Sequence, residues 1–465
     1  MELCLGRVHL SAPDIVAWSR GLNRLVIEPA ALDVVGRRAA AAVEMADRQP
    51  VYGQTTGLGA NRDHRVTDDA AGLRMLLSHA SAAGEPYPAD AARVAVLIRV
   101  NQLLRGGSGI SLPVVHALVR MLNDDEVPVV RRGGAVGTGD LSALAQVGMA
   151  LGEAMDARSA LPLMSSNAFT LASAVLGWER WLRLLAVGHR IAALTALALG
   201  ANSEAYADQV QAQRRIDRQR KVAAEMRELL DGSTERPWRV QDPFGLRAYP
   251  QVVGVGATAL DELATAIEVD ANAALENPLF SDDTVWHHGN WTAQLISLRS
   301  DTARLALYSV ASLSMSRISD LMDPSLTGAT RFLAAGPEPS SGALMLEYLA
   351  TAAVNSLAVS AQPALLGQIR ISLGAEAHAS FAPDSVEALH SMVDEFQLTM
   401  ACELVAAVRA IRMRGNTTIV ADAAIGDVLA RALATLPAGL EDRSLTQDVD
   451  DARDLIEQWY ADQSG

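Results

Sequence analysis

Apolar positions along this chain recur mainly at spacings of three and four residues, the period of amphipathic helices. Near the start, Ser11 precedes a proline and an acid, which predicts a capped helix N-terminus, and a second helix is expected from about Pro29 to Asp47. The pattern is helical again from Trp178 to Leu230. The clearest stripe predicts one helix with a core or subunit-interface face: Val393, Phe396, Met400, Leu404, Val408 and Ile411.

Composition strengthens the helical interpretation. Half of the 465 residues are hydrophobic while aromatics make up only 4%, so the apolar mass is mostly Ala, Leu and Val. Small side chains of this kind, abundant from Ala343 to Ala361, allow helix backbones to pack closely. No Pro/Ser-rich linker or charged block divides the chain. We therefore predict an all-α protein with one continuous fold.

Charge and cysteine content exclude several classes of function. The formal net charge is −15 and no dense basic cluster is present, which argues against a nucleic-acid partner. Cys4 and Cys402 are too few for a disulfide framework and lack metal-ligand spacing, so no metal is expected. The chain has no P-loop or dinucleotide fingerprint, no basic leader and no run of 18 apolar residues. We expect a cytoplasmic protein without a membrane partner.

One glycine-rich stretch stands out as the candidate for chemistry. Residues 133–144 read Gly-Gly-Ala-Val-Gly-Thr-Gly-Asp-Leu-Ser-Ala-Leu, between a strand-like Val127–Val130 and an Ala/Leu/Met run. Four glycines in so short a segment predict a tight turn that opens a buried helix. Any chemistry of this turn would reside in its backbone.

Two further segments accompany this turn and carry a family resemblance. One is Tyr52-Gly-Gln-Thr-Thr-Gly-Leu-Gly59, and the other is Gln241-Asp-Pro-Phe-Gly-Leu-Arg247. Together with the turn they resemble the histidine and phenylalanine ammonia-lyase family over roughly residues 40 to 415. The resemblance implies a long helical bundle at 156–465, preceded by a smaller loop-rich helical region at 1–155. It also implies a homotetramer in which three chains build each active site around an amino acid or carboxylate substrate.

The family's electrophile is altered in this sequence. In the family an Ala-Ser-Gly triplet cyclises and loses water to form methylidene-imidazolone (MIO), so no external cofactor is needed. Here the corresponding residues are Gly137, Thr138 and Gly139, and the segment is one residue short. A threonine would leave a methyl-substituted alkene, which forms less easily and is harder to attack. A modified MIO and a purely structural turn both stay open, and we favour the turn.

The resemblance assigns roles to the residues that are retained. Tyr52 corresponds to the acid/base. Arg247 corresponds to the carboxylate anchor, a task that suits a guanidinium fork, and Asn290 helps to hold the carboxylate. His79, Phe332 and Glu376 correspond to positions around the substrate side chain, although core or interface packing would also explain His79, and core packing Phe332. The candidate substrate-binding residues are His79, Gln241, Phe244, Arg247, Asn290, Phe332, Glu376 and Ser165.

The altered positions share one task, because in the family they form or surround MIO. Thr138 replaces the serine of the triplet, and Ser165, Phe244 and Ala375 replace an asparagine, a tyrosine and a glutamine. We interpret this pattern as a carboxylate pocket that persists while activation of the amine by MIO is weakened or abandoned. The predicted function is elimination, addition or isomerisation at the α and β carbons of an aromatic or histidine-like amino acid. The alternative is a non-catalytic homologue that acts as a scaffold or partner subunit of an active paralogue.

Overall fold

The computed structural model describes residues 2–6, 8–21, 23–232, 237–281, 283–415 and 424–462. These residues form two compact units, and four of the five boundaries between the units fall inside long helices, while the fifth lies between Gln362 and Pro363. Unit 1 comprises residues 1–179, 262–301 and 363–387, and unit 2 comprises residues 180–261, 302–362 and 388–465. The units interleave along the chain, so the regions 1–155 and 156–465 stay a prediction. The four long helices are α8 (Ala168–Leu199), α12 (Tyr249–Ala271), α13 (Gln294–Met322) and α16 (Ala382–Arg414).

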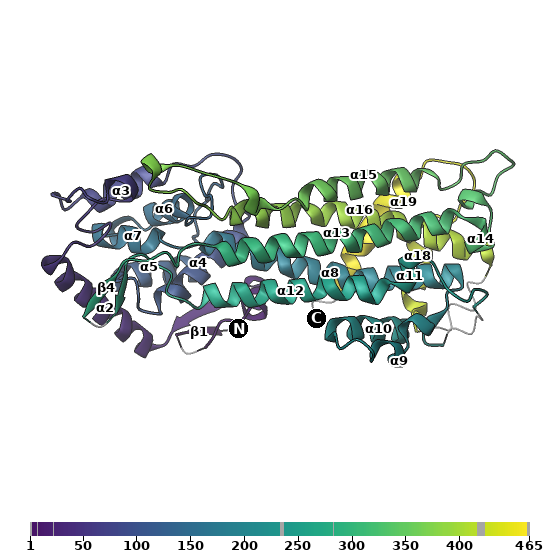
Figure 1. Ribbon diagram of the computed structural model, residues 1–465, viewed down its shortest axis with the longest axis horizontal. Helices are drawn as coiled ribbons and strands as arrows, with labels where there is room; N and C mark the ends of the chain where they lie inside the picture. Colours follow the sequence, from purple (N-terminus) through teal and green to yellow (C-terminus); the bar gives the residue numbers. More distant parts are fainter. Residues whose placement is uncertain are drawn as a thin grey trace. The chain divides into compact units, whose positions relative to one another are not determined.

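Unit 1 is mainly helical and carries the two small sheets of the described chain. The strands β1 and β2 pair in parallel, and β3 and β4 pair antiparallel, with two strands in each sheet. The helices α3, α6 and α7 contact one another, as do α4 and α5. The bounds are β1 (Glu2–Leu5), α1 (Ala12–Ser19), β2 (Arg24–Ile27), α2 (Pro29–Arg48), α3 (Ala71–His79), α4 (Ala89–Leu103), α5 (Leu112–Asn123), α6 (Leu141–Ala150), α7 (Ala160–Met164), β3 (Leu279–Ser281) and β4 (Thr284–Trp286). Figure 1 labels β1, β4 and α2 to α7 among them.

Helix α4 forms the centre of unit 1, because every residue from Val94 to Leu104 is buried. A charged side chain, Arg99, lies in this buried stretch. Its Nη1–H donates to Oε1 of the buried Glu276 at 3.0 Å and to Gln102, and its Nε–H donates to the Leu163 carbonyl. A buried charge is tolerated only when it is paired and hydrogen-bonded in this way. The pair therefore fixes the segment around Glu276 against α4 and α7.

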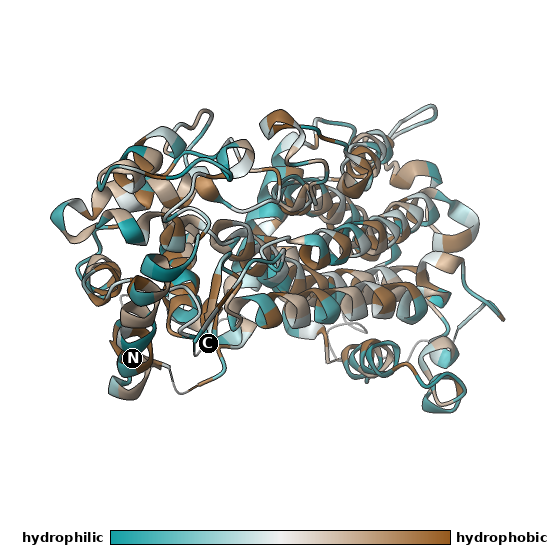
Figure 2. Ribbon diagram, turned by 60° about the vertical axis from the view of Figure 1, so that its left-hand side comes forward, coloured by the Kyte–Doolittle hydropathy of each residue, from teal (hydrophilic) through white to brown (hydrophobic). Residues whose placement is uncertain are grey.

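Unit 2 consists of helices in its described part. Besides portions of the long helices it contains α9 (Asp208–Gln211), α10 (Asp217–Leu229), α11 (Phe244–Arg247), α14 (Pro324–Thr327), α15 (Met345–Ser360), α18 (Gly426–Thr435) and α19 (Thr446–Ala461). The stripe predicted from Val393 to Ile411 lies on α16, and all six of its side chains are buried. The stripe is thus core, the first of the two predicted alternatives. Apolar and polar residues alternate around the helices of both units, as the brown and teal segments in Figure 2 show.

The structure confirms the all-α class and several predicted helix boundaries. Helix α2 begins at Pro29 and ends at Arg48, and Ser11 caps α1 in a capping box with Asp14. The strand-like interpretation of Val127–Val130 is wrong. These residues form no strand, and the Val130 carbonyl instead accepts a single hydrogen bond from the Tyr87 N–H. An apolar pattern without a neighbouring strand gives extended backbone but no sheet.

One described segment meets the length and hydropathy of a membrane span. It runs from Ala157 to Leu199, and its most apolar window is 78% buried within the protein. A core helix of a folded protein passes the same test, so this segment is weak evidence for a span. We interpret it as interior packing of α7 and α8.

Candidate active site

A cavity of about 2180 Å³ lies in unit 1. Its walls come from three distant parts of the sequence: residues 46–165, with the glycine-rich loop after α2, α3, the turn at residues 138–141 and α7; the segment 277–292; and the segment 372–378. The volume exceeds that of a typical small-ligand pocket, which is about 300–1,000 Å³. The candidate residues that line this one cavity are Tyr52, His79, Thr138, Ser165 and Glu376.

Tyr52 is held by hydrogen bonds at both its backbone and its phenol. The Gly59 N–H donates to the Tyr52 phenol oxygen at 2.8 Å, and the Tyr52 N–H donates to Nε2 of His287 at 3.2 Å. Gly53 beside it has a φ of +71°, and a Cβ there would lie 2.1 Å from Leu161. The loop therefore requires glycine at that position to bring Tyr52 to the cavity wall. The backbone donor of Gly59 can stabilise negative charge that develops on the phenol oxygen.

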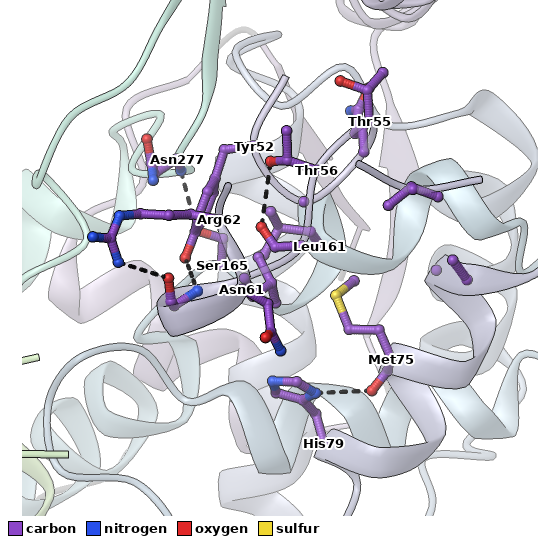
Figure 3. A pocket seen from close by; sticks show the side chains of 18 of the residues that line it. Tyr52, Thr55, Thr56, Asn61, Arg62, Met75, His79, Leu161, Ser165 and Asn277 are labelled. Atoms are coloured by element: carbon purple, nitrogen blue, oxygen red, sulfur yellow. Dashed lines mark hydrogen bonds between the residues drawn. The ribbon is translucent and has the colours of Figure 1, made fainter. Parts of the chain in front are cut away.

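His79 ends α3 and faces the same cavity. Its Nδ1 lies 2.9 Å from the Met75 carbonyl oxygen, the contact drawn in Figure 3. Because a carbonyl only accepts hydrogen bonds, Nδ1 carries the proton and Nε2 is left as an acceptor. His79 can thus accept a hydrogen bond from a polar substrate side chain.

The glycine-rich turn lies against the start of α16. Ser380 Oγ donates to the Gly137 carbonyl at 3.0 Å, and the Phe381 N–H donates to the Val136 carbonyl at 3.0 Å. Gly137 and Gly139 are buried with φ values of +85° and +109°, whereas Thr138 between them faces the cavity. A Cβ on Gly137 would lie 2.0 Å from Ser380 Oγ. An alanine, the family's first triplet residue, does not fit this turn as it is folded here.

The turn leads into α6 through a buried carboxyl group. Asp140 accepts hydrogen bonds from the Thr170 N–H and hydroxyl, both at 2.8 Å, and its own N–H donates to the Ser166 carbonyl. Burial raises the pKa of Asp140 to about 6, although the bonds from Thr170 oppose that shift. These contacts attach the turn to the start of α8. Asp140 therefore acts as an anchor of the turn and does not face the cavity lining.

Ser165 and Ala375, which replace the family's asparagine and glutamine beside the turn, do not offer the polar groups of those residues to the turn. The Ser165 hydroxyl accepts a hydrogen bond from the Asn277 N–H at 3.1 Å, as Figure 3 shows, so it supports the chain around Asn277. Ala375 lines the cavity but offers no polar side-chain atom. Asn167 lies elsewhere, with its Nδ2 donating to the Trp291 carbonyl and with no place in the cavity lining.

Acidic side chains outnumber basic ones on the cavity wall. Among the described lining residues, Asp68 pairs with Arg74 and Asp63 lies 3.9 Å from Arg62. Burial, with the neighbouring His287, lowers the pKa of His288, so this histidine is neutral at pH 7. The charged lining residues are Asp47, Asp63, Asp68, Asp69, Asp156, Glu376, Arg62, Arg74 and Arg158.

The predicted carboxylate anchor belongs to unit 2. The Arg247 Nη1–H donates to the Gln241 side-chain oxygen at 2.7 Å, and its guanidinium carbon lies 4.7 Å from the centre of the Phe244 ring. The short helix α11 that carries Arg247 is itself fixed by buried groups. Arg317 donates to the Gly245 carbonyl and forms a two-point ion pair with Glu403, and the Tyr206 hydroxyl donates to the Leu246 carbonyl.

Two more candidates lie outside the cavity lining. Phe332 belongs to unit 2, in the short 3-10 helix Arg331–Leu333, where its φ is +56°. Asn290 belongs to unit 1, and its backbone N–H donates to Nδ1 of the neighbouring His288. The structure therefore brings five candidates together in one cavity and places Gln241, Phe244, Arg247 and Phe332 in the other unit.

The cavity also contains residues that sequence reasoning did not select. His287 and Ser372 bind the loop that carries Tyr52, and Asn277 and Trp291 line the wall beside Ser165. The histidine pair at 287–288, directly before a Gly-Asn turn, is the one local signal that could have suggested a site. Among the described residues, no group of three or more His, Cys, Asp or Glu side chains is placed to hold a metal ion.

Comparison with known proteins identifies the family to which this arrangement belongs. The family model described as aromatic amino acid lyase matches residues 10–156 and 153–435. The chain belongs to this family. It is 33% identical over 447 residues to a histidine ammonia-lyase from Symbiobacterium thermophilum, with 88% of this chain and 87% of that protein covered. A histidine ammonia-lyase from Geobacillus thermodenitrificans is 30% identical over 465 residues, with 92% and 91% covered.

Solved structures of aromatic amino acid lyase relatives share the fold. An ergothioneine-degrading enzyme, ergothionase, from Treponema denticola superposes with a TM-score of 0.92 at 23% identity, covering 99% of both chains. A phenylalanine aminomutase from Pantoea agglomerans superposes with a TM-score of 0.90 at 19% identity, covering 97% of this chain and 98% of that chain. The family relationship makes this protein an enzyme of the carbon–nitrogen lyase or aminomutase type that acts on amino acids.

Proposed function

We propose that this enzyme catalyses elimination, addition or isomerisation at the α and β carbons of an amino acid or related carboxylate. Tyr52 is the acid/base, and the reaction proceeds without a normal MIO group. The observation that carries the proposal is the Tyr52 phenol on the cavity wall, with a backbone N–H donating to its oxygen at 2.8 Å. A positioned proton-transfer group of this kind contributes typically 10²- to 10⁴-fold to a rate.

The residues around the turn do not fit MIO. Gly137 replaces the family's alanine where a Cβ would meet Ser380 Oγ, and Thr138 replaces the serine that loses its hydroxyl. The Ser165 hydroxyl is occupied by the Asn277 N–H, and Ala375 has no polar group. We therefore derive no step through MIO for this chain.

The chemistry that remains is a proton transfer coupled to loss of a leaving group. Deprotonated Tyr52 takes the proton from the β carbon, and the electron pair of that C–H bond forms the α,β double bond. The α carbon–nitrogen bond breaks, and its electron pair leaves with the nitrogen. Gly59 donates to the phenol oxygen while that oxygen carries negative charge. Addition is the reverse of these steps.

Without MIO, the favoured substrate is one whose nitrogen can leave the α carbon without first forming a bond to an electrophile. The T. denticola enzyme of the same fold degrades ergothioneine. Ergothioneine is a betaine in which the amino group of a histidine derivative carries three methyl groups. Its quaternary nitrogen has no lone pair with which to attack an electrophile, and it departs as neutral trimethylamine. A histidine-like betaine therefore suits the altered turn better than a primary amine does. We assign the acceptor Nε2 of His79 and the carboxylate of Glu376 to its imidazole-type ring, because both side chains line the cavity.

We assign the substrate carboxylate to Arg247, with Gln241 orienting the guanidinium and Asn290 assisting. The Phe244 ring lies against the Arg247 guanidinium and supplies apolar surface beside it, and we assign Phe332 to the wall around the substrate side chain. We propose that the protein is a homotetramer with active sites shared between chains. Support comes from the outer face of α15, where Met345, Tyr348 and Val359 are 59%, 62% and 68% exposed. Apolar surface of this kind is expected at subunit contacts. A cytoplasmic location remains part of the proposal.

The deciding experiment combines intact mass with a substrate panel. The purified protein is expected to have the mass of its unmodified chain, with peptides covering residues 132–155 showing no loss of water. The panel comprises ergothioneine, histidine betaine, histidine, phenylalanine and tyrosine, followed by absorbance of the unsaturated acid and by released amine. Turnover of a betaine with release of trimethylamine supports the proposal. A loss of two waters at residues 137–139 would overturn its MIO-free part.

The altered turn also favours a second function, a scaffold or partner subunit of an active paralogue. This alternative predicts no turnover of any panel substrate by the pure protein. Any turnover that Tyr52→Phe abolishes rules it out.

A further inference from the structure

The loop that carries Tyr52, residues 51–66, is the feature from which a further inference follows. Much of its backbone bonding is internal: the Gln54, Thr55 and Thr56 N–H groups all donate to the Val51 carbonyl, at 3.1, 2.9 and 3.2 Å. The Val66 N–H donates back to the Thr55 carbonyl. Such bonds set the shape of the loop but do not attach it to the rest of unit 1. Attachment requires contacts with other segments.

Two side chains from distant segments accept hydrogen bonds from this loop. His287 Nε2 accepts from the Tyr52 N–H at 3.2 Å, and Ser372 Oγ accepts from the Ala60 N–H at 3.1 Å. One contact is at Tyr52 itself, and the other is at Ala60, the residue after the Gly59 that donates a hydrogen bond to the Tyr52 phenol. Each side chain belongs to a segment that also lines the cavity.

The Ser372 contact involves a close approach of the Gly59 backbone to the Ser372 side chain. Gly59 has a φ of +52°, and a Cβ at this position would lie 2.3 Å from Ser372 Oγ. The residue that donates to the Tyr52 phenol therefore lies next to the Ser372 hydroxyl in space, and in sequence it directly precedes Ala60, which donates to that hydroxyl. Ser372 holds Ala60, Ala60 is bonded to Gly59, and Gly59 donates to the phenol oxygen.

The segment that presents Ser372 has an unfavourable backbone. Ser372 and Leu373 have φ values of +53° and +52°, a region that costs non-glycine residues about 1–2 kcal/mol each. Packing of Leu373 does not compensate, because its side chain is 97% exposed. Backbone strain of this kind tends to be retained at functional sites. Here the strained turn directs the Ser372 hydroxyl to the Tyr52 loop.

We propose that Ser372 and His287 are positioning residues that hold the Tyr52 loop, and through Gly59 the phenol oxygen, in the geometry needed for proton transfer. The proposal rests on the proposed role of Tyr52 as acid/base. Neither side chain needs to contact the reacting atoms. Loss of either contact leaves the phenol present but imprecisely placed, and misplacement by about 1 Å can cost on the order of 10²-fold in rate.

The test uses matched variants of the full-length protein. Ser372→Ala removes the hydroxyl and keeps the strained backbone, whereas Ser372→Gly removes the hydroxyl and relieves the strain at that residue. Leu373→Gly relieves strain next to it and leaves the hydroxyl intact, so it is the control. His287→Ala removes the acceptor for the Tyr52 N–H, and His287→Gln places an amide oxygen at similar reach and is expected to restore function.

Two readouts are compared, amide hydrogen exchange in peptides covering residues 51–61 and steady-state kinetics with the panel substrate that is turned over. Both Ser372 variants and His287→Ala are expected to raise loop exchange and lower kcat by about 10-fold or more, with KM changed by less than about 3-fold. Leu373→Gly is expected to match the wild type in both. A similar loss in Ser372→Ala and Ser372→Gly shows that the hydroxyl, and not the strain, is responsible.

Unchanged exchange of the 51–61 peptides in Ser372→Ala, Ser372→Gly and His287→Ala would overturn the positioning role. Tyr52→Phe, measured in parallel, separates this outcome from failure of the proposed function. If Tyr52→Phe retains full turnover, the acid/base assignment is wrong, whereas the exchange data still decide whether Ser372 and His287 hold the loop. If Tyr52→Phe is inactive and the three variants exchange faster but keep full kcat, the positioning role in catalysis is wrong.

Discussion

The Gly59 N–H donates a 2.8 Å hydrogen bond to the phenol oxygen of Tyr52, seven residues earlier in the same loop. Tyr52, the catalytic candidate, and Gly59, which donates the hydrogen bond to its phenol oxygen, thus belong to the same loop. Tyr52→Phe is expected to lower kcat/KM by about 10²- to 10⁴-fold, because it removes the proton-transfer group and keeps the ring. Kinetics with the active panel substrate, and circular dichroism to verify folding, would check this. Turnover within about 3-fold of the wild type would contradict the assignment.

A change at Arg247 is expected to affect substrate binding more than the chemical step. Arg247→Lys keeps the positive charge but loses the planar fork and the bond to Gln241. We expect KM to rise about 10- to 100-fold, the equivalent of one or two charge-assisted hydrogen bonds. The matched control is Arg431→Lys, because Arg431 is exposed, pairs with Asp462 and is remote in sequence from Arg247. This substitution should leave KM unchanged. A fall in kcat at constant KM would argue against a carboxylate anchor.

The proposed sharing of active sites between chains leads to a prediction about mixed oligomers. Tyr52 lies in unit 1 and Arg247 in unit 2, so a site built from different chains can obtain each from a separate subunit. Tyr52→Phe and Arg247→Met should each be inactive alone. Unfolding and refolding them together in equal amounts should restore about a quarter of the wild-type activity, the fraction of randomly mixed sites that receive both native residues. Absence of recovery in verified mixed tetramers would contradict sites shared in this way.

The buried pair of Arg99 and Glu276 should dominate the local stability of unit 1. Glu276→Gln leaves the Arg99 charge buried without its carboxylate, which costs about 3–5 kcal/mol in comparable cases. Urea unfolding should therefore show a clearly lower midpoint. Glu44→Gln removes an exposed pair with Arg48 and should cost less than about 0.5 kcal/mol. Equal midpoints for the two variants would show that the buried pair is unimportant.

The half-buried carboxyl of Asp270 makes stability depend on pH. Burial raises its pKa from 3.8 to about 6, so ionisation opposes folding. The penalty is absent below pH 3.8, grows between pH 4 and 6, and is complete above pH 6. Asp270→Asn is expected to stabilise the protein at pH 8 by about 1–3 kcal/mol and to have little effect near pH 4. Urea unfolding at both pH values, with the exposed Asp33→Asn as control, checks this. An equal effect of Asp270→Asn at both pH values would contradict it.

Local signals in the sequence were enough to predict several parts of this structure. The capping pattern at Ser11 and the proline at residue 29 placed two helix starts correctly, because caps and first-turn prolines act over a few residues. The glycines of residues 133–139 indicated a tight turn for the same reason, and all four of them have positive φ values. Val127–Val130 was predicted wrongly, since a strand depends on a partner that its own residues do not specify.

The contacts that attach the Tyr52 loop could not be predicted from the sequence. His287 is 235 residues from Tyr52, and Ser372 is 312 residues from Ala60. A lone histidine or serine at such a separation carries no local pattern, and only the folded chain shows which of them reaches the loop. The position of Arg247 in a second unit likewise follows from the tertiary structure and not from its motif.

The wall of the cavity is drawn from three separate stretches of unit 1, around residues 46–165, 277–292 and 372–378. For protein engineering this means that the pocket cannot be transplanted as a single cassette. A chimera that takes only the Tyr52 loop from a histidine ammonia-lyase would place a foreign loop against the native Ser372 and His287, whose hydrogen bonds fit the original loop. Exchange of substrate preference within this family therefore requires coordinated replacement of all three stretches.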